Sequence, residues 1–127
     1  MTSDKIRVLV VEDNEQNRIL MRQILIHHGY EVLEAVDGLT GLELARTQLP
    51  ALILLDIQMP MMNGFAVIRE LRQDSGALKT CKVIAVTSFA MKGDREKAIE
   101  AGFDEYVTKP IDTRKFPEVI KQVLGRV

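Results

Sequence analysis

Short aliphatic runs alternate with longer amphipathic segments along this chain, and the alternation repeats five times without a linker. Short β-branched runs predict strands, whereas apolar residues spaced by three or four positions predict helices. Repeated strand–helix units favour a parallel sheet with helices on both faces. We therefore expect a doubly wound α/β fold with a five-stranded parallel sheet and five helices. The expected strands are residues 6–11, 31–35, 51–55, 82–87 and 105–109.

The expected helices follow these strands. They are residues 14–28, a segment that ends before Pro50, residues 65–72, residues 94–101, and a last segment that Asp112 can cap. Pro117 lies near the start of the last helix, where its missing N–H is tolerated only if regular hydrogen bonding begins late. At the first helix, either Asp13 or Asn14 could be the cap.

Composition limits what the chain can be. Its 127 residues can bury one core but are too few for two domains. Seventeen basic and eighteen acidic side chains leave a net charge of −1, so no net field favours direct nucleic-acid binding. The apolar runs fall far short of the roughly 20 residues that cross a bilayer, which argues against membrane insertion. Cys81 is the only cysteine, which fits a reducing, cytoplasmic location.

Polar residues end four of the five expected strands. They are Glu12 and Asp13 after the first strand, Asp56 after the third, Thr87 at the end of the fourth and Lys109 at the end of the fifth. In open α/β sheets, ligands bind beyond the carboxyl ends of the strands. We therefore expect these side chains to share one pocket. Three adjacent carboxylates repel one another unless a cation intervenes, and an all-oxygen acidic pocket suits Mg²⁺.

Structural explanations exist for each residue taken alone. A single acid after a strand is more often a helix cap than a ligand, and a lone lysine there is usually solvated. Unrelated structural roles would not place all three kinds of side chain at the same end of the sheet. The combination therefore favours a functional site.

At residues 6–124 the sequence resembles the receiver domain of two-component response regulators. The resemblance lies in VVEDN at residues 10–14, LLDIQMP at 54–60, NG at 63–64, VTS at 86–88 and YVTKP at 106–110. The segment FAMKGD at 89–94 further resembles single-domain receivers of the DivK type. The resemblance implies a flavodoxin-like or CheY-like fold with strand order 2-1-3-4-5. It also implies a single receiver domain over residues 1–127, with no output domain.

By this resemblance, Asp56 is the phosphoacceptor. It attacks a phosphohistidine and becomes an acyl phosphate, which is nucleophilic catalysis by a carboxylate. Glu12, Asp13, Asp56 and the backbone carbonyl of Gln58 would hold Mg²⁺, with Mn²⁺ as a substitute. Lys109 would pair with a phosphoryl oxygen.

The resemblance also assigns a switch. Thr87 would donate a hydrogen bond to the phosphoryl group, and Tyr106 would fill the space that Thr87 vacates. The peptide bond before Pro110 would be cis, as it is in the family. The structural alternative for Tyr106 is an aromatic ring that packs against the fourth helix.

The resemblance implies a switch rather than an enzyme, with a sensor histidine kinase or a histidine phosphotransfer protein as phosphodonor. A downstream protein target would bind the face made of the fourth helix, fifth strand and fifth helix, and the protein would be a monomer or a phosphorylation-dependent dimer.

One alternative is a receiver domain cut from a hybrid histidine kinase or a larger regulator. Two more distant alternatives have less support: an aspartyl-nucleophile phosphatase needs a second acid where Gln58 stands, and a flavin carrier needs a hydroxyl-rich loop after the first strand.

Overall fold

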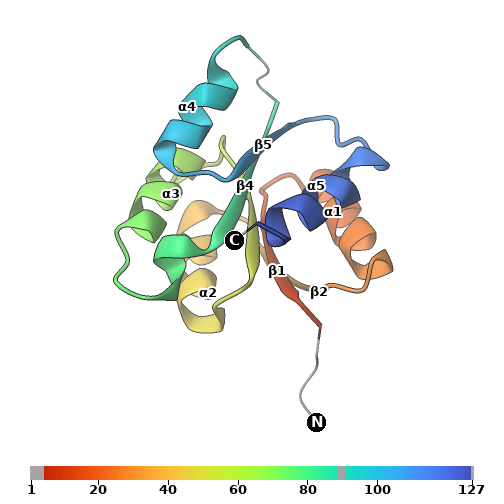
Figure 1. Cartoon of the computed structure of the whole chain (residues 1–127), viewed down its shortest axis with the longest axis horizontal. Helices are drawn as coiled ribbons and strands as arrows, with labels where there is room; N and C mark the ends of the chain where they lie inside the picture. The colour runs from red at the N-terminus through yellow and green to blue at the C-terminus, as the bar shows by residue number, and fades with distance from the viewer. Residues whose placement is uncertain (1–4, 89–90, 127) are drawn as a thin grey trace.

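The protein consists of a five-stranded parallel sheet with helices on both faces (Figure 1). The computed structural model describes residues 5–88 and 91–126. The strand order is β2-β1-β3-β4-β5, which confirms the expected 2-1-3-4-5 topology. The elements, in chain order, are β1 (Arg7–Val11), α1 (Glu15–His27), β2 (Glu31–Ala35), α2 (Gly38–Gln48), β3 (Leu52–Asp56), α3 (Gly64–Arg72), a 3-10 turn η1 (Ala77–Thr80), β4 (Lys82–Thr87), α4 (Asp94–Ala101), β5 (Glu105–Thr108) and α5 (Lys115–Leu124).

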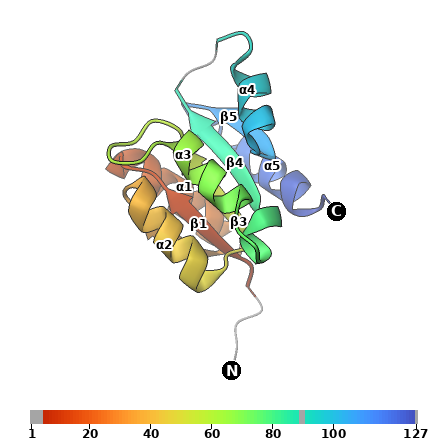
Figure 2. The ribbon, with the colours of Figure 1, turned by 90° about the vertical axis from the view of Figure 1, so that its left-hand side faces the viewer.

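The sheet separates two hydrophobic cores. Helices α1 and α5 cover one face and α2, α3 and α4 the other, as the two views show (Figures 1 and 2). Successive side chains of a strand point to opposite faces. Leu9 and Ile53 accordingly belong to the core under α2 and α3, whereas Val8 and Leu54 belong to the core under α1 and α5. Burial on both faces explains why β1 and β3 are almost wholly aliphatic.

The helices differ in how firmly they are anchored. Helix α5 buries Phe116, Pro117, Ile120 and Val123 against the sheet. Helix α4 buries Ala98 alone. Little apolar surface therefore holds α4 in place.

Side-chain caps start the first three helices. The cap of α1 is Asn14, whose side chain accepts a hydrogen bond from the Asn17 amide at 2.9 Å. Asp37 caps α2 and Asn63 caps α3 in the same way. This decides between the two caps considered for α1, because Asn14 fills that role and Asp13 does not.

The start of α5 differs from the prediction that Asp112 is its cap. Arg114 occupies the cap position without a side-chain hydrogen bond, and regular helix begins at Lys115. Asp112 still accepts hydrogen bonds from the backbone amides of Arg114 and Lys115, at 2.9 and 3.2 Å. Because Pro117 has no N–H, the turn that contains Asp112 cannot continue as regular helix, and hydrogen bonding begins late, as expected.

Other differences are small. Strand β1 starts at Arg7 rather than residue 6, β5 ends at Thr108, and the turn η1 was not predicted. Phe89 and Ala90, which begin the DivK-like segment, lie outside the described residues. Within the described part of the chain, no helix has the length and apolar character needed to cross a membrane.

Arg72, at the end of α3, joins several segments. Its guanidinium donates to the carbonyls of Gly102 at 2.9 Å and Cys81 at 2.7 Å, and to Asp104 Oδ2 at 3.1 Å. Further bonds reach carbonyls of η1. Asp104 Oδ2 also accepts from the Val83 amide at 2.7 Å. One half-buried side chain thus connects α3, the start of β4 and the segment before β5.

Candidate functional site

The parallel register brings the polar strand ends to one edge of the sheet. Val11 pairs with Leu55, Asp56 with Val86, and Thr87 with Thr108, so the strands end at similar heights. Carboxylate oxygens of Glu12, Asp13 and Asp56 lie within 4.8 Å of one another. The predicted meeting of three carboxylates at this edge is therefore present.

Lys109 neutralises part of this negative charge. Its Nζ lies 2.7 Å from Glu12 Oε1 and 3.2 Å from Asp56 Oδ2, and its side chain is 12% exposed. Burial alone would lower the pKa of Lys109, but the two carboxylates stabilise the ammonium and the net effect raises it. Lys109 is therefore a fixed cation beside Asp56.

Glu12 is fully buried, which is unusual for a carboxylate. Burial raises its pKa from 4.5 to about 7, and the charge of Asp56 adds to the rise. Lys109 and the Asn14 amide, which donates to Oε2 at 3.1 Å, act in the opposite direction. Within the described residues, Oε1 has no hydrogen bond of suitable direction, so its contact with Lys109 is an ion pair only.

These residues fit a hard dication. The donor set consists of carboxylate oxygens, Asp13 is exposed to solvent, and Glu12 carries a buried oxygen that lacks a hydrogen bond. Mg²⁺ prefers such ligands, and it keeps several waters when only one or two carboxylates bind it directly. The net charge of three carboxylates and one ammonium also favours an added cation.

The raised pKa of Glu12 predicts a pH dependence for the metal-free protein. Between pH 4.5 and about 7, folded protein holds a proton on Glu12 that the unfolded chain has released. The free energy of unfolding should therefore fall as pH rises through this interval. Urea unfolding in the presence of a chelator, at several pH values, measures the effect. The Glu12→Gln variant should show a flatter dependence, and equal slopes for both proteins would contradict the prediction.

Asp56 lies at the end of β3 and is buried at the floor of this site. Its Oδ1 accepts a hydrogen bond from the Gln58 amide at 3.2 Å. The Lys109–Pro110 peptide bond is cis, as the sequence resemblance implied. The use of the Gln58 carbonyl as a metal ligand stays a prediction.

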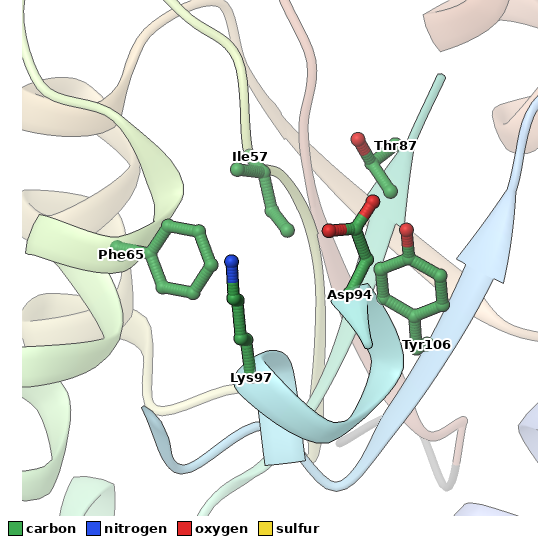
Figure 3. Close-up of a pocket in the computed structure, with 6 residues that line it drawn as sticks. All are labelled: Ile57, Phe65, Thr87, Asp94, Lys97 and Tyr106. Atoms are coloured by element: carbon green, nitrogen blue, oxygen red, sulfur yellow. The ribbon is translucent and has the colours of Figure 1, made fainter. Parts of the chain in front are cut away.

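Thr87 and Tyr106 line a neighbouring cavity of about 170 Å³ between α3, α4 and the sheet (Figure 3). Thr87 is buried, whereas Tyr106 is half-buried and packs against the core on this face. Burial raises the pKa of the Tyr106 phenol, and the nearby Asp94 carboxylate raises it further. Figure 3 shows Asp94 beside Tyr106 and Thr87, while Lys97 points toward Phe65.

Sequence reasoning missed some of these neighbours. The sequence assigns Lys97 only to a helix, and Asp94 to that helix and the DivK-like segment, although both line the cavity. Arg18, which donates to the Glu12 carbonyl at 3.1 Å, was not singled out either. These residues do not end strands, so the signal that identified the acidic residues could not identify them.

Comparison with known proteins places the chain in a family. Residues 8–121 match the family described as "Response regulator receiver domain". The chain belongs to this family. As a receiver domain it takes part in two-component signalling, and it is a phosphoacceptor switch rather than a classical enzyme. Membership implies a histidine kinase as its partner.

Individual relatives support the same assignment. The receiver domain is 46% identical to the polar-differentiation response regulator DivK of Brucella anthropi over 118 residues, which cover 93% of this chain and 95% of DivK. A receiver domain of the sensor histidine kinase PA1611 from Pseudomonas aeruginosa is 30% identical, with a TM-score of 0.87 over 96% of this chain and 99% of that one. That structure holds a magnesium ion in its active site cleft.

A CheY-like receiver domain protein from Methanospirillum hungatei is also similar. It is 31% identical with a TM-score of 0.83, over 95% of this chain and 94% of the other. Similarity therefore extends over nearly the whole length of each receiver domain, and the acidic edge described above is the site that such domains share with this protein.

Proposed function

We propose that Asp56 accepts a phosphoryl group from a phosphohistidine of a sensor histidine kinase or a histidine phosphotransfer protein. A carboxylate oxygen of Asp56 forms a bond to phosphorus while the P–N bond to the donor ring breaks, and the ring leaves as neutral imidazole that keeps the proton already on its other nitrogen. The observation that carries the proposal is the convergence of three carboxylates and one half-buried ammonium at the carboxyl edge of the sheet.

The other residues of the edge have supporting roles in this proposal. Glu12, Asp13, Asp56 and the Gln58 carbonyl would hold Mg²⁺ or Mn²⁺. The bound dication would neutralise negative charge on the phosphoryl oxygens. Lys109, whose Nζ lies 3.2 Å from Asp56 Oδ2, would exchange this ion pair for one with a phosphoryl oxygen. Positioning and charge neutralisation are the main demands of phosphoryl transfer.

We further propose that Thr87 and Tyr106 convert this chemistry into a change of shape. Thr87 would donate a hydrogen bond to the phosphoryl group, and Tyr106 would move into the space that Thr87 leaves. The shared cavity of about 170 Å³ supports this, because it provides room for both side chains to rearrange. A switch needs a contact that differs between its two states, and the Thr87 hydrogen bond supplies one.

The downstream protein would bind the face of α4, β5 and α5. Glu105 of β5 joins these elements, with Oε1 2.9 Å from Arg95 of α4 and Oε2 3.1 Å from Arg126 after α5. A pocket of about 340 Å³ on the same face, lined in part by Tyr106 and Val119, gives a partner apolar surface to contact. Either a monomer or a phosphorylation-dependent dimer would present this face.

We propose that residues 1–127 form a single receiver domain in the cytoplasm, where Cys81 stays reduced. A second candidate is a receiver that works within a hybrid histidine kinase. It is favoured by the similarity to the receiver domain of the kinase PA1611, at 30% identity. The length of the protein made from its native gene decides between the two.

Incubation with acetyl phosphate tests the phosphoacceptor function. We expect a gain of one phosphoryl group by intact mass in the presence of Mg²⁺ and none in the presence of a chelator. Hydroxylamine should remove the group, because it cleaves acyl phosphates but not phosphate esters. A gain that does not depend on the metal, or that survives hydroxylamine, would contradict the proposal.

A further inference from the structure

Arg18 contacts the backbone of the acidic site. Its Nη1 donates to the carbonyl of Glu12 at 3.1 Å. The other polar groups of Glu12 have partners of their own: the amide donates to the Ala35 carbonyl at 3.0 Å, Oε2 accepts from the Asn14 amide at 3.1 Å, and Oε1 lies 2.7 Å from Lys109. Of these contacts, the one to Arg18 comes from a side chain outside the expected site.

Arg18 is itself held in place. It lies one turn into α1, and helical side chains lean toward the start of their helix, which directs Arg18 toward the loop after β1. Its Nε is 3.4 Å from Glu34 Oε1 of β2, and its side chain is only 17% exposed. Arg22, one turn later, pairs with the same carboxylate at 3.1 Å. Glu34 thus anchors Arg18 to the sheet.

We propose that Arg18 is a positioning residue of the dication site. The carbonyl of Glu12 and the amide of Asp13 belong to one planar peptide unit, so a hydrogen bond to that carbonyl fixes the plane from which both residues project. Arg18 and Glu34 therefore brace the loop that presents two of the three carboxylates. This inference rests on the proposed use of these carboxylates to hold a dication.

Removal of Arg18 changes Mg²⁺ affinity in two opposite ways, through the loss of its charge and through the loss of its hydrogen bond to the Glu12 carbonyl. A guanidinium near the site repels a dication, so its loss would strengthen metal binding if Coulomb repulsion were dominant. Glu34, 3.4 Å from Arg18 and shared with Arg22, neutralises part of this charge. The hydrogen bond from Arg18 orders the Glu12–Asp13 peptide before the metal binds, so less conformational entropy is lost on binding. Loss of this hydrogen bond therefore weakens Mg²⁺ binding. We expect the second effect to exceed the first.

Calorimetric titration with MgCl₂ alone, without phosphodonor, distinguishes these effects. Arg18→Gln should weaken Mg²⁺ binding on the order of tenfold, as loss of a group that orients metal ligands typically does. Arg18→Lys keeps the charge but cannot hold Glu34 and the Glu12 carbonyl with one planar group, so it should also weaken binding. Arg22→Gln is the matched control, because Arg22 shares Glu34 but does not contact Glu12, and it should leave the affinity within about twofold.

Urea unfolding of each variant shows whether it is folded, and Arg18→Lys remains informative if Arg18→Gln is too unstable to titrate. Unchanged or tighter Mg²⁺ binding by a folded Arg18 variant would overturn the inference, as would an equal loss in Arg22→Gln. Failure of the wild-type protein to bind Mg²⁺ would instead refute the proposed function. The two failures are thus distinguishable.

Discussion

Replacing Asp56 with asparagine is expected to abolish the gain of a phosphoryl group from acetyl phosphate in the presence of Mg²⁺. The amide has nearly the same shape as the carboxylate but carries no charge and is a poor nucleophile. Lys109 also loses one of its two carboxylate partners, while Glu12 remains 2.7 Å away to pair with it. Intact mass of the wild-type and variant proteins after equal incubation measures the difference.

Loss of phosphorylation in this variant should not reflect unfolding. The charge of Asp56 raises the pKa of Glu12, so removing that charge relieves a repulsion in the metal-free protein. We expect a free energy of unfolding equal to or above that of the wild type. Asp37→Asn is a suitable control, because asparagine caps a helix as well as aspartate does. Phosphorylation of the Asp56 variant at the wild-type level would refute the assignment of Asp56.

Replacing Arg72 with alanine should lower the free energy of unfolding by about 3 kcal/mol. The change leaves Asp104 without its ion-pair partner and removes the donor to the carbonyls of Gly102 and Cys81. Hydrogen bonds to a charged guanidinium are stronger than those between neutral groups, and the half-buried Asp104 carboxylate keeps the Val83 amide but loses its charged donor. The shift of the midpoint in urea unfolding, at unchanged slope, measures the loss.

Arg69 provides the control for this change. It lies on the same helix and is exposed, and its side chain makes no hydrogen bond or ion pair with the described residues. Arg69→Ala makes the same change in helix propensity and should alter stability by no more than about 0.5 kcal/mol. Similar losses in the two variants would show that Arg72 does not join these segments energetically.

Much of the fold could be predicted because local pattern and global architecture agree. Strands that are buried on both faces have aliphatic sequences, so β1 and β3 were recognisable without their partners. The site followed from one topological rule, since parallel strands that end at one edge bring Glu12, Asp56 and Lys109 together. The resemblance to receiver domains added roles to residues that this rule had already selected.

Contacts between distant segments could not be predicted in this way. The partners of Arg72 lie between 6 and 32 positions away in the sequence, and no periodicity marks them. Arg18 appears from the sequence as an ordinary polar residue of a helix, and its contact with Glu12 depends on the path of the loop after β1. The turn η1 was missed because a single short turn has no repeating pattern to detect.

The weak anchorage of α4 affects how small a signal can reorganise the protein. Helix α4 buries one alanine and forms a solvent-exposed ion pair with β5 through Arg95, so its displacement costs little free energy. Displacement of α5 would have to withdraw an aromatic ring and several aliphatic groups. One hydrogen bond to a charged group contributes roughly 1.5–3 kcal/mol. Under the proposed function, a single phosphoryl group at the sheet edge would therefore displace α4 more readily than α5.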